Sequence, residues 1–215
     1  MFKRNPRSYL RIIAEFFYPR GGWYRAAQYV IHRLRRLPDP AHRISRGIAA
    51  GIFASFTPFF GLHFLTAAIL SWIMRGNVLA SLLATFIGNP ITFPLIAELS
   101  VNLGNAMLGL PSDVHLPEIA AQFAGATTDL WANLRAGFTE DVADWSRLSQ
   151  FVDRVFYPYL VGCLVPGIVA GTAGYVLANP LIHAYQRRRI KKLKERYEKR
   201  LSARPDKAGD SVENR

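Results

Sequence analysis

The stretch that decides the fold is RGIAAGIFASFTPFFGLHFLTAAILSWIMRGNVLASLLATFIGNPITFPLI, residues 46–96. Within it, residues 47–74 run for 28 positions without an Asp, Glu, Lys or Arg, and after Arg75 a second uncharged run covers residues 76–97. A third uncharged run spans residues 155–186. Apolar runs of this length are typical of helices that cross a membrane rather than of core helices in soluble domains. The sequence therefore predicts an all-α integral membrane protein.

Charge divides the 215 residues into three blocks. Residues 1–46 hold 11 Lys and Arg against two acids, and residues 187–215 hold 12 against five. Between them, residues 98–154 hold eight acids against three arginines. Basic segments beside membrane spans remain in the cytoplasm. We therefore predict that both termini are cytoplasmic and that residues 111–154 form an extramembrane loop on the outer side.

The formal net charge of +12 also raises nucleic acid as a partner. The basic residues, however, lie within about 20 residues of apolar runs, where they set topology and contact anionic lipid. We therefore expect membrane lipids as partners and no nucleic acid.

Three parts follow from this pattern. Residues 1–46 form a basic cytoplasmic arm of amphipathic helices, which either lie at the headgroup boundary or pack on the bundle. Residues 47–186 form the membrane domain, whose acidic loop contains two amphipathic helices that we interpret as a structural cap over its outer side. Residues 187–215 form a basic cytoplasmic tail, helical at first and ending near Pro205.

Prolines and glycines interrupt two of the apolar runs. Three ordinary spans would leave the basic C-terminus outside, so one run must fail to cross. We favour a re-entrant hairpin at residues 47–74, since it keeps Arg75 on the cytoplasmic side. Each break frees backbone groups that lipid cannot satisfy, so the two turns are expected to meet and bury each other. The residues predicted to form these turns are Pro58, Gly61, Pro90 and Pro94.

Small residues recur at a spacing of four in these runs, a pattern that lets helices approach closely. They are Gly47 and Gly51, then Ala80, Ala84 and Gly88, then Gly167 and Gly171.

A set of motif residues carries a resemblance to a known family. The set is Pro58 and Gly61, Arg75 and Asn77, then Asn89, Pro90, Thr92 and Pro94, and YPRGGW at residues 18–23 is similar too. Residues 18–110 resemble the bacterial membrane family called domain of unknown function 2062. The resemblance implies a multi-pass protein of the bacterial inner membrane without an established activity. Some relatives carry glycosyltransferase modules, which implies an envelope or glycosyltransferase partner.

Motifs for catalysis, metal binding or cofactor binding do not stand out, so we expect no enzyme activity, catalytic residue, metal or cofactor. Polar residues near the breaks are the candidates for ligand binding, because half-helix N-termini direct N–H groups toward anions. These candidates are His63, Arg75, Asn89 and Thr92. Each also has a structural interpretation, as a residue that caps or closes a broken helix.

Two functions remain open at this point. The first is binding or translocation of an anionic lipid or lipid-carrier headgroup at the broken helices. The alternative is a non-catalytic membrane scaffold that binds a partner protein through its basic arms. A polar cavity at the turns would favour the first, and a filled bundle would favour the second.

Overall fold

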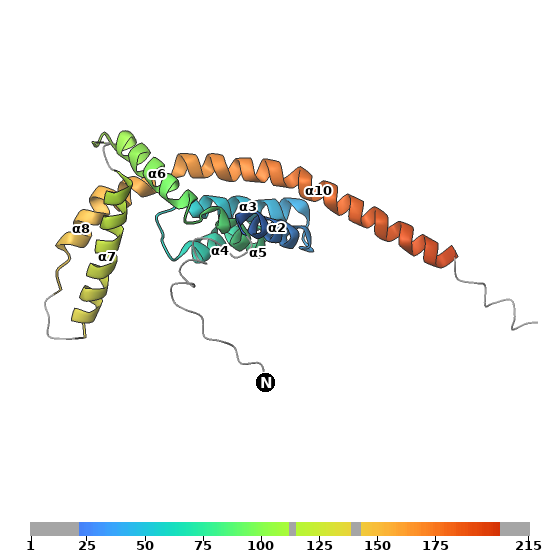
Figure 1. The fold of residues 1–215 in the computed structure, drawn as a ribbon, viewed down its shortest axis with the longest axis horizontal. Helices are drawn as coiled ribbons and strands as arrows, with labels where there is room; N and C mark the ends of the chain where they lie inside the picture. Colours follow the sequence, from blue (N-terminus) through green and yellow to red (C-terminus); the bar gives the residue numbers. More distant parts are fainter. Residues whose placement is uncertain (1–21, 112–114, 139–142, 203–215) are drawn as a thin grey trace, which may run out of the picture.

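The computed structural model describes residues 22–111, 115–138 and 143–202, and every element in these ranges is helical (Figure 1). This confirms the all-α prediction. The amphipathic helix expected near residues 10–17 and the end of the tail lie outside the described residues. The helices are α2 (Gly22–Arg35), α3 (Ala41–Phe56), α4 (His63–Ile73), α5 (Val78–Ala84), η1 (Thr85–Ile87), α6 (Thr92–Leu108), α7 (Leu116–Ala136), α8 (Ser146–Phe151), the π-helical η2 (Val152–Phe156), α9 (Tyr157–Gly162) and α10 (Leu164–Ser202).

Helices α3, α4 and α5 lie side by side as two consecutive hairpins. The tightest contact is between α3 and α5, where a Cβ built on Gly47 would lie 3.1 Å from the Cβ of Ala80. One turn further on, a Cβ on Gly51 would lie 2.8 Å from the Cβ of Ala84. The predicted role of these spaced small residues is confirmed, because larger side chains would force the two backbones apart.

Helix α10 packs along α3 in the opposite direction (Figure 1). A Cβ on Gly171 would lie 3.0 Å from the carbonyl oxygen of Ala49, and one on Gly167 would lie 3.0 Å from the ring of Phe53. At the other end, Gln186 Nε2 donates a hydrogen bond of 2.9 Å to the backbone oxygen of Asp39. The chain therefore enters α3 and leaves the apolar part of α10 at the same end of the molecule.

The two predicted breaks are present, with one correction. α3 ends at Phe56 and α4 begins at His63, while η1 ends at Ile87 and α6 begins at Thr92. Pro94, which we predicted to lie in the second turn, instead occupies the first turn of α6. A proline is tolerated there because the first N–H groups of a helix have no intrahelical partner. α3 already begins at Ala41, before the uncharged run that starts at residue 47, and is about 24 Å long.

The second break turns the chain sharply. Helices Val78–Ile87 and Thr92–Leu108 are bent by 88° to each other. α6 then packs antiparallel to α9, where a Cβ on Gly104 would lie 1.8 Å from the carbonyl oxygen of Pro158. A Cβ on Gly162 would lie 1.9 Å from the carbonyl oxygen of Ser100. Glycine at both positions brings the two backbones into direct contact.

Helices α7 and α8 form a hairpin that projects from the other helices (Figure 1). Its base joins a buried cluster with α6 and α9 that includes Ile119, Phe151 and Tyr159. Toward its tip, Asn133 Nδ2 donates to the carbonyl oxygen of Asp144 at 2.7 Å, and Asn133 Oδ1 accepts from the Asp144 N–H at 2.9 Å. The two amphipathic helices are confirmed, but the expected cap is wrong for the distal half. The reason is that α6 and α9 contact only the base of the hairpin, so its far end has no helix to cover.

One continuous helix in the described residues, Ser146–Ser202, is long and apolar enough to cross a membrane. Only 22% of its most apolar 18-residue window is buried, whereas the core helix of a soluble protein is mostly buried. The bent pair Val78–Ile87 and Thr92–Leu108 meets the same criterion if it is counted as one span. The long apolar helix suggests membrane association, while the multi-pass topology and the re-entrant segment at residues 47–74 stay predictions.

Candidate functional site

The first turn, between α3 and α4, is closed by its own residues. Thr57 Oγ1 donates to the carbonyl oxygen of Ala54 at 2.7 Å, and His63 Nε2 lies 3.2 Å from the carbonyl oxygen of Thr57. A carbonyl oxygen only accepts, so this ring nitrogen is the donor. Gly61 has a φ of +80° with open space around it, so glycine is required here for backbone conformation rather than for room.

The second turn, between η1 and α6, is closed by Asn89 and Thr92. Asn89 Oδ1 accepts from the N–H groups of Ile91 at 2.9 Å and Thr92 at 3.1 Å. Thr92 Oγ1 accepts from the Asn89 N–H at 3.0 Å and donates to the carbonyl oxygen of Ile87. These bonds satisfy backbone groups that the break releases, so both side chains have a structural role.

Aromatic rings bring the two turns together, as we predicted. The ring centroid of Phe60 lies 4.5 Å from that of Phe93 and 4.2 Å from that of Phe123. The His63 ring lies 5.4 Å from Phe93. Edge-on and tilted contacts at these distances are favourable and hold the two turns together. His63 therefore lies beside the first turn of α6, which Asn89 and Thr92 precede and begin.

Arg75 does not join them. It follows α4, whose 11 residues span about 16 Å, so Arg75 is exposed at the end of this helix opposite His63. Its φ of +51° is in the left-handed region, while the following N–H, of Gly76, donates to the carbonyl oxygen of Ser71 at 2.7 Å. This is a helix C-terminal motif in which glycine is usual at the position of Arg75. No ion pair joins Arg75 to Glu98 in the part of the chain that the structure describes.

The glycine stands one position later, at Gly76, because the backbone of α3 passes too close there for a side chain. A Cβ on Gly76 would lie 2.7 Å from the backbone nitrogen of Gly47. Arg75 thus carries the strained conformation, which costs about 1 kcal/mol in a residue with a side chain. We expect Arg75→Gly to raise the unfolding free energy slightly or leave it unchanged, whereas Gly76→Ala lowers it by several kcal/mol. Thermal unfolding in detergent checks both, and a strongly destabilised Arg75→Gly would contradict this account of the turn.

An apolar groove of about 460 Å³ lies between α2 and the second break. Asn89 and Thr92 contribute its polar lining at one end. The remaining lining comes from α2 (Ala26, Ala27, Val30, Ile31, Leu34), from α3, α5 and η1 (Ile48, Leu83, Ala84, Phe86, Ile87) and from Ile91. Two of the four predicted site residues therefore border a cavity, and this cavity suits an apolar ligand.

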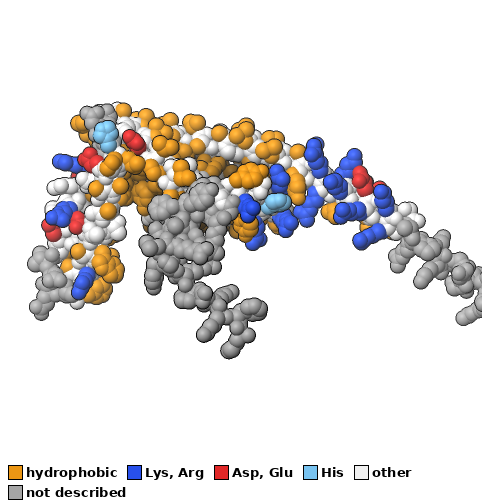
Figure 2. Space-filling model, viewed as in Figure 1, with side chains coloured by type: hydrophobic (Ala, Val, Ile, Leu, Met, Phe, Trp, Pro, Cys, Tyr) orange, Lys and Arg blue, Asp and Glu red, His pale blue; other side chains and the backbone are white. Residues whose placement is uncertain are grey.

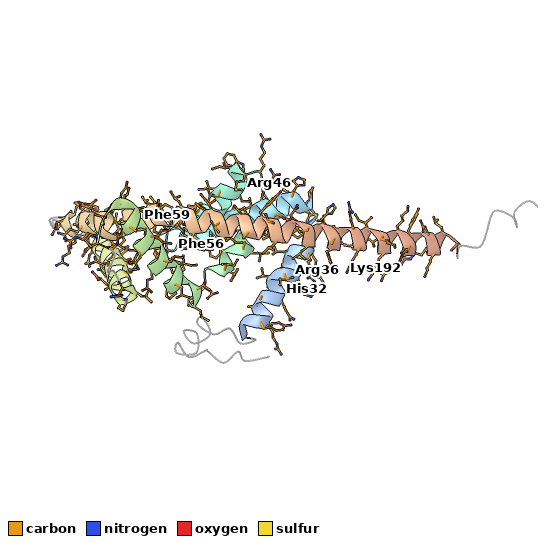
Figure 3. The ribbon with its side chains drawn as sticks, turned by 90° about the horizontal axis from the view of Figure 1, so that it is seen from above. His32, Arg36, Arg46, Phe56, Phe59 and Lys192 are labelled. Carbon is orange, nitrogen blue, oxygen red and sulfur yellow. The ribbon has the colours of Figure 1, made fainter. Side chains whose placement is uncertain are left out.

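Two basic surfaces lie near the same end of the molecule. One is the opposite face of α2 together with the residue after it, and it includes Arg25, Arg33 and Arg36 with His32 and Tyr29. The other is a stretch of α10 that includes Arg188, Arg189, Lys192 and Arg196. Arg35 stacks over the ring of Tyr185 at 5.6 Å and so connects the end of α2 with α10. Figure 2 shows the Lys and Arg side chains gathered there. Figure 3 shows His32 on α2 and Arg36 just after its end, near α10, with Lys192 further along α10.

A junction at this end was not predicted. Asp39 accepts a short hydrogen bond from Asn77 Nδ2 and pairs with Arg43 at 3.0 Å. Asn77 Oδ1 also accepts from the Ala80 N–H at 2.7 Å, as the N-cap of α5, and Gln186 bonds the Asp39 backbone. Asn77 belongs to the motif that carried the family resemblance, and Asp39 stands between two prolines just before α3. Each indicates a fixed turn at its own position, but neither indicates that the two residues meet.

The comparison with protein families gives one match. The family described as "Uncharacterized protein conserved in bacteria (DUF2062)" matches residues 24–191. The match confirms the resemblance noted from the motifs and extends through the hairpin and into the basic part of α10. No curated protein and no solved structure matches the chain.

Proposed function

Because the chain belongs to this bacterial family, whose description names no activity, we propose its function from the groove and the basic surfaces. We propose that the chain is a multi-pass inner-membrane protein that binds an anionic lipid or lipid carrier. The lipid chains occupy the groove beside α2, and the headgroup phosphate meets the basic side chains of α2 and α10. The observation that carries the proposal is that α2 has an apolar groove on one face and arginines on the other.

The ends of the chain support a topology with both termini in the cytoplasm. The bond between Gln186 and Asp39 holds the start of α3 beside the end of the apolar part of α10, so both basic segments leave from one end. The acidic hairpin of α7 and α8 lies at the other end (Figure 1). Residues 164–186 span about 34 Å, close to the ~30 Å of a hydrocarbon core, while α3 at about 24 Å falls short of it.

The groove has the size and lining of a site for lipid chains. Its volume lies within the range of about 300–1,000 Å³ typical of small-molecule sites. The side chains of Asn89 and Thr92 form hydrogen bonds with the backbone of the second turn. They therefore shape the end of the groove rather than bind a charged headgroup. His63 likewise bonds Thr57. We therefore assign the headgroup to the arginines and not to the turns.

The basic surfaces suit a phosphate at the membrane boundary. Each Lys or Arg near an anionic surface contributes about 1 kcal/mol, and this contribution falls as salt is added. An amphipathic helix with arginines on one face and apolar residues on the other lies in the interface plane. α2 combines these properties and runs across the direction of α10 (Figure 3).

Lipid binding by the purified protein tests the proposal. Arg33→Gln with Arg36→Gln removes two charges, so affinity for phosphatidylglycerol in nanodiscs should fall about 30-fold at low salt, with little change for phosphatidylethanolamine. The matched control is Lys199→Gln with Arg200→Gln, at the far end of α10. Ala27→Trp, which fills the groove, should weaken binding of both lipids. Equal affinity of the Arg33/Arg36 variant and the wild type, with both folded, would refute the proposal. A dithionite assay with labelled lipid separates translocation from binding alone.

A specific feature favours the scaffold as a second candidate function. Beyond Arg187, α10 projects from the other helices and carries an exposed apolar stripe (Figure 1). Ile190, Leu193, Tyr197 and Leu201 recur at spacings of three and four, which is the pattern of a helix that pairs with another helix. Under this alternative, Leu201→Glu, which lies outside the basic surface of α10, abolishes self-association or partner capture and leaves lipid affinity intact. Sedimentation of the detergent-solubilised protein measures self-association.

A further inference from the structure

The distal half of α7 carries an exposed apolar stripe. Leu130 is 43% exposed, Trp131 71%, Leu134 51% and Phe138 93%. Leu130, Trp131 and Leu134 recur at helical spacing, so they share one side of the helix, and Phe138 follows in the turn after α7 ends at Ala136. Three large apolar side chains on one exposed side of a helix, followed by an exposed phenylalanine, indicate a surface that another apolar phase covers.

The stripe continues a contact that is already formed. Counting from Phe123, residues 130 and 134 fall within about 20° of the same face at 100° per residue. Phe123 itself packs on Phe60, in the turn between α3 and α4. The face that contacts the membrane domain at the base of the hairpin therefore extends outward toward its tip without a covering element among the described residues.

The other side of the hairpin is polar. Asp129 and Arg147 lie 3.8 Å apart there, bridging α7 and α8. Hydrogen bonds from the side chain and backbone N–H of Ser146 lower the pKa of Asp144, so this carboxylate stays charged near the tip. Figure 2 shows hydrophobic side chains at the free end of the hairpin, on the side toward the rest of the molecule. The hairpin thus has an apolar side and a charged side.

We propose that the α7–α8 hairpin lies on the outer surface of the membrane, with the stripe Leu130, Trp131, Leu134 and Phe138 in the boundary between headgroups and chains. The hairpin runs across the direction of α10 (Figure 1), so it is parallel to the membrane plane if α10 crosses it. Tryptophan and phenylalanine are enriched at such boundaries. The acids of residues 98–154 disfavour an anionic surface, so the lipid is zwitterionic. This inference rests on the membrane placement proposed above.

Tryptophan quenching by brominated lipid tests it. The chain has four tryptophans, so single-tryptophan variants retain either Trp131 or Trp72. Trp72, 76% exposed on α4, reports membrane insertion itself. A third variant carries Asp129→Trp as its only tryptophan, on the charged side. In phosphatidylcholine nanodiscs brominated near the headgroup, Trp131 should lose fluorescence and emit at shorter wavelength than the tryptophan at position 129.

The outcomes separate the two claims. Quenching of Trp72 without quenching of Trp131 overturns the hairpin inference and leaves the membrane placement standing. Absence of quenching at both positions overturns the membrane placement. Equal quenching at positions 131 and 129 contradicts a one-sided contact. Efficient disulfide dimers of Phe138→Cys in a Cys163→Ser background, with Trp131 unquenched, would show that a second copy covers the stripe instead.

Discussion

Replacing Gly104 by alanine is expected to leave little folded protein. The Cβ of the alanine would lie 1.8 Å from the carbonyl oxygen of Pro158 and 2.5 Å from the carbonyl carbon. The new methyl group would therefore overlap the backbone of α9. If a side chain stood where the Pro158 carbonyl stands, it could rotate away from the new methyl group. The backbone of α9 can move only if the two helices separate. Overpacking that side chains can absorb costs about 1–3 kcal/mol, and a backbone obstruction exceeds that range. Gly162→Ala, 1.9 Å from the Ser100 oxygen, should have the same effect.

Gly125→Ala is the matched control. Gly125 lies within α7 with nothing within 4 Å of its Cβ position, so alanine there should stabilise the helix by up to about 1 kcal/mol. Folded yield and melting temperature in detergent compare the three variants. If Gly104→Ala melts at the same temperature as Gly125→Ala, the contact between α6 and α9 is not as the structure places it.

The second large effect is expected at Asn77. Asn77→Ala removes the N-cap of α5, which contributes about 1 kcal/mol, and the charge-assisted bond from Asn77 to Asp39, which contributes about 1.5–3 kcal/mol; the pair of Asp39 with Arg43 remains. Asp39 is only 23% exposed at its side chain, so water replaces this bond incompletely. The free energy of unfolding should therefore fall by about 3 kcal/mol.

Other alanine variants show whether the loss of stability in Asn77→Ala comes from the contact of Asn77 with Asp39. Gln122→Ala removes an exposed amide from α7 and should change stability by less than about 0.5 kcal/mol. Asp39→Ala should resemble Asn77→Ala, and the double variant should cost less than the sum of the two. Strict additivity in chemical unfolding would show that Asp39 and Asn77 do not interact.

The breaks and the close helix contacts could be predicted because their signals are local. Proline and glycine at positions 58 and 61 end a helix in any surroundings. The backbone N–H and C=O groups freed at such a break must then be buried away from lipid. Small residues at a spacing of four, as at Gly47 and Gly51, mark a helix face on which a neighbour can approach. Each of these features depends on chemistry within one turn or two of the chain.

Features that join distant segments could not be predicted in this way. Asn77 lies 38 positions from Asp39, and Gln186 lies 147 positions from it. Nothing in one short window says that these polar groups meet. The contact of Gly104 with α9 has a weak signal, since Ser100 and Gly104 have a spacing of four, but an apolar segment does not reveal its partner. The projecting hairpin depends on where its base packs.

The candidate site shows the same limit. Asn89 and Thr92 were identified from the break that they close, and the structure places both beside the groove. Arg75 was chosen because it is the one cation between two apolar runs, yet the length of α4 takes it to the opposite end. The groove itself was missed, because it forms between α2 and a segment more than 50 residues away.

Topology in the cell is the most direct measurement of the central claim, a multi-pass protein with both basic ends in the cytoplasm. Alkaline phosphatase is active only outside the cytoplasm, and green fluorescent protein exported in unfolded form fluoresces only inside. Each reporter is fused after Phe138, in the hairpin, and after Ser202, at the end of α10. The account predicts phosphatase activity at Phe138 and fluorescence at Ser202. Phosphatase activity after Ser202, or fluorescence after Phe138, would contradict it.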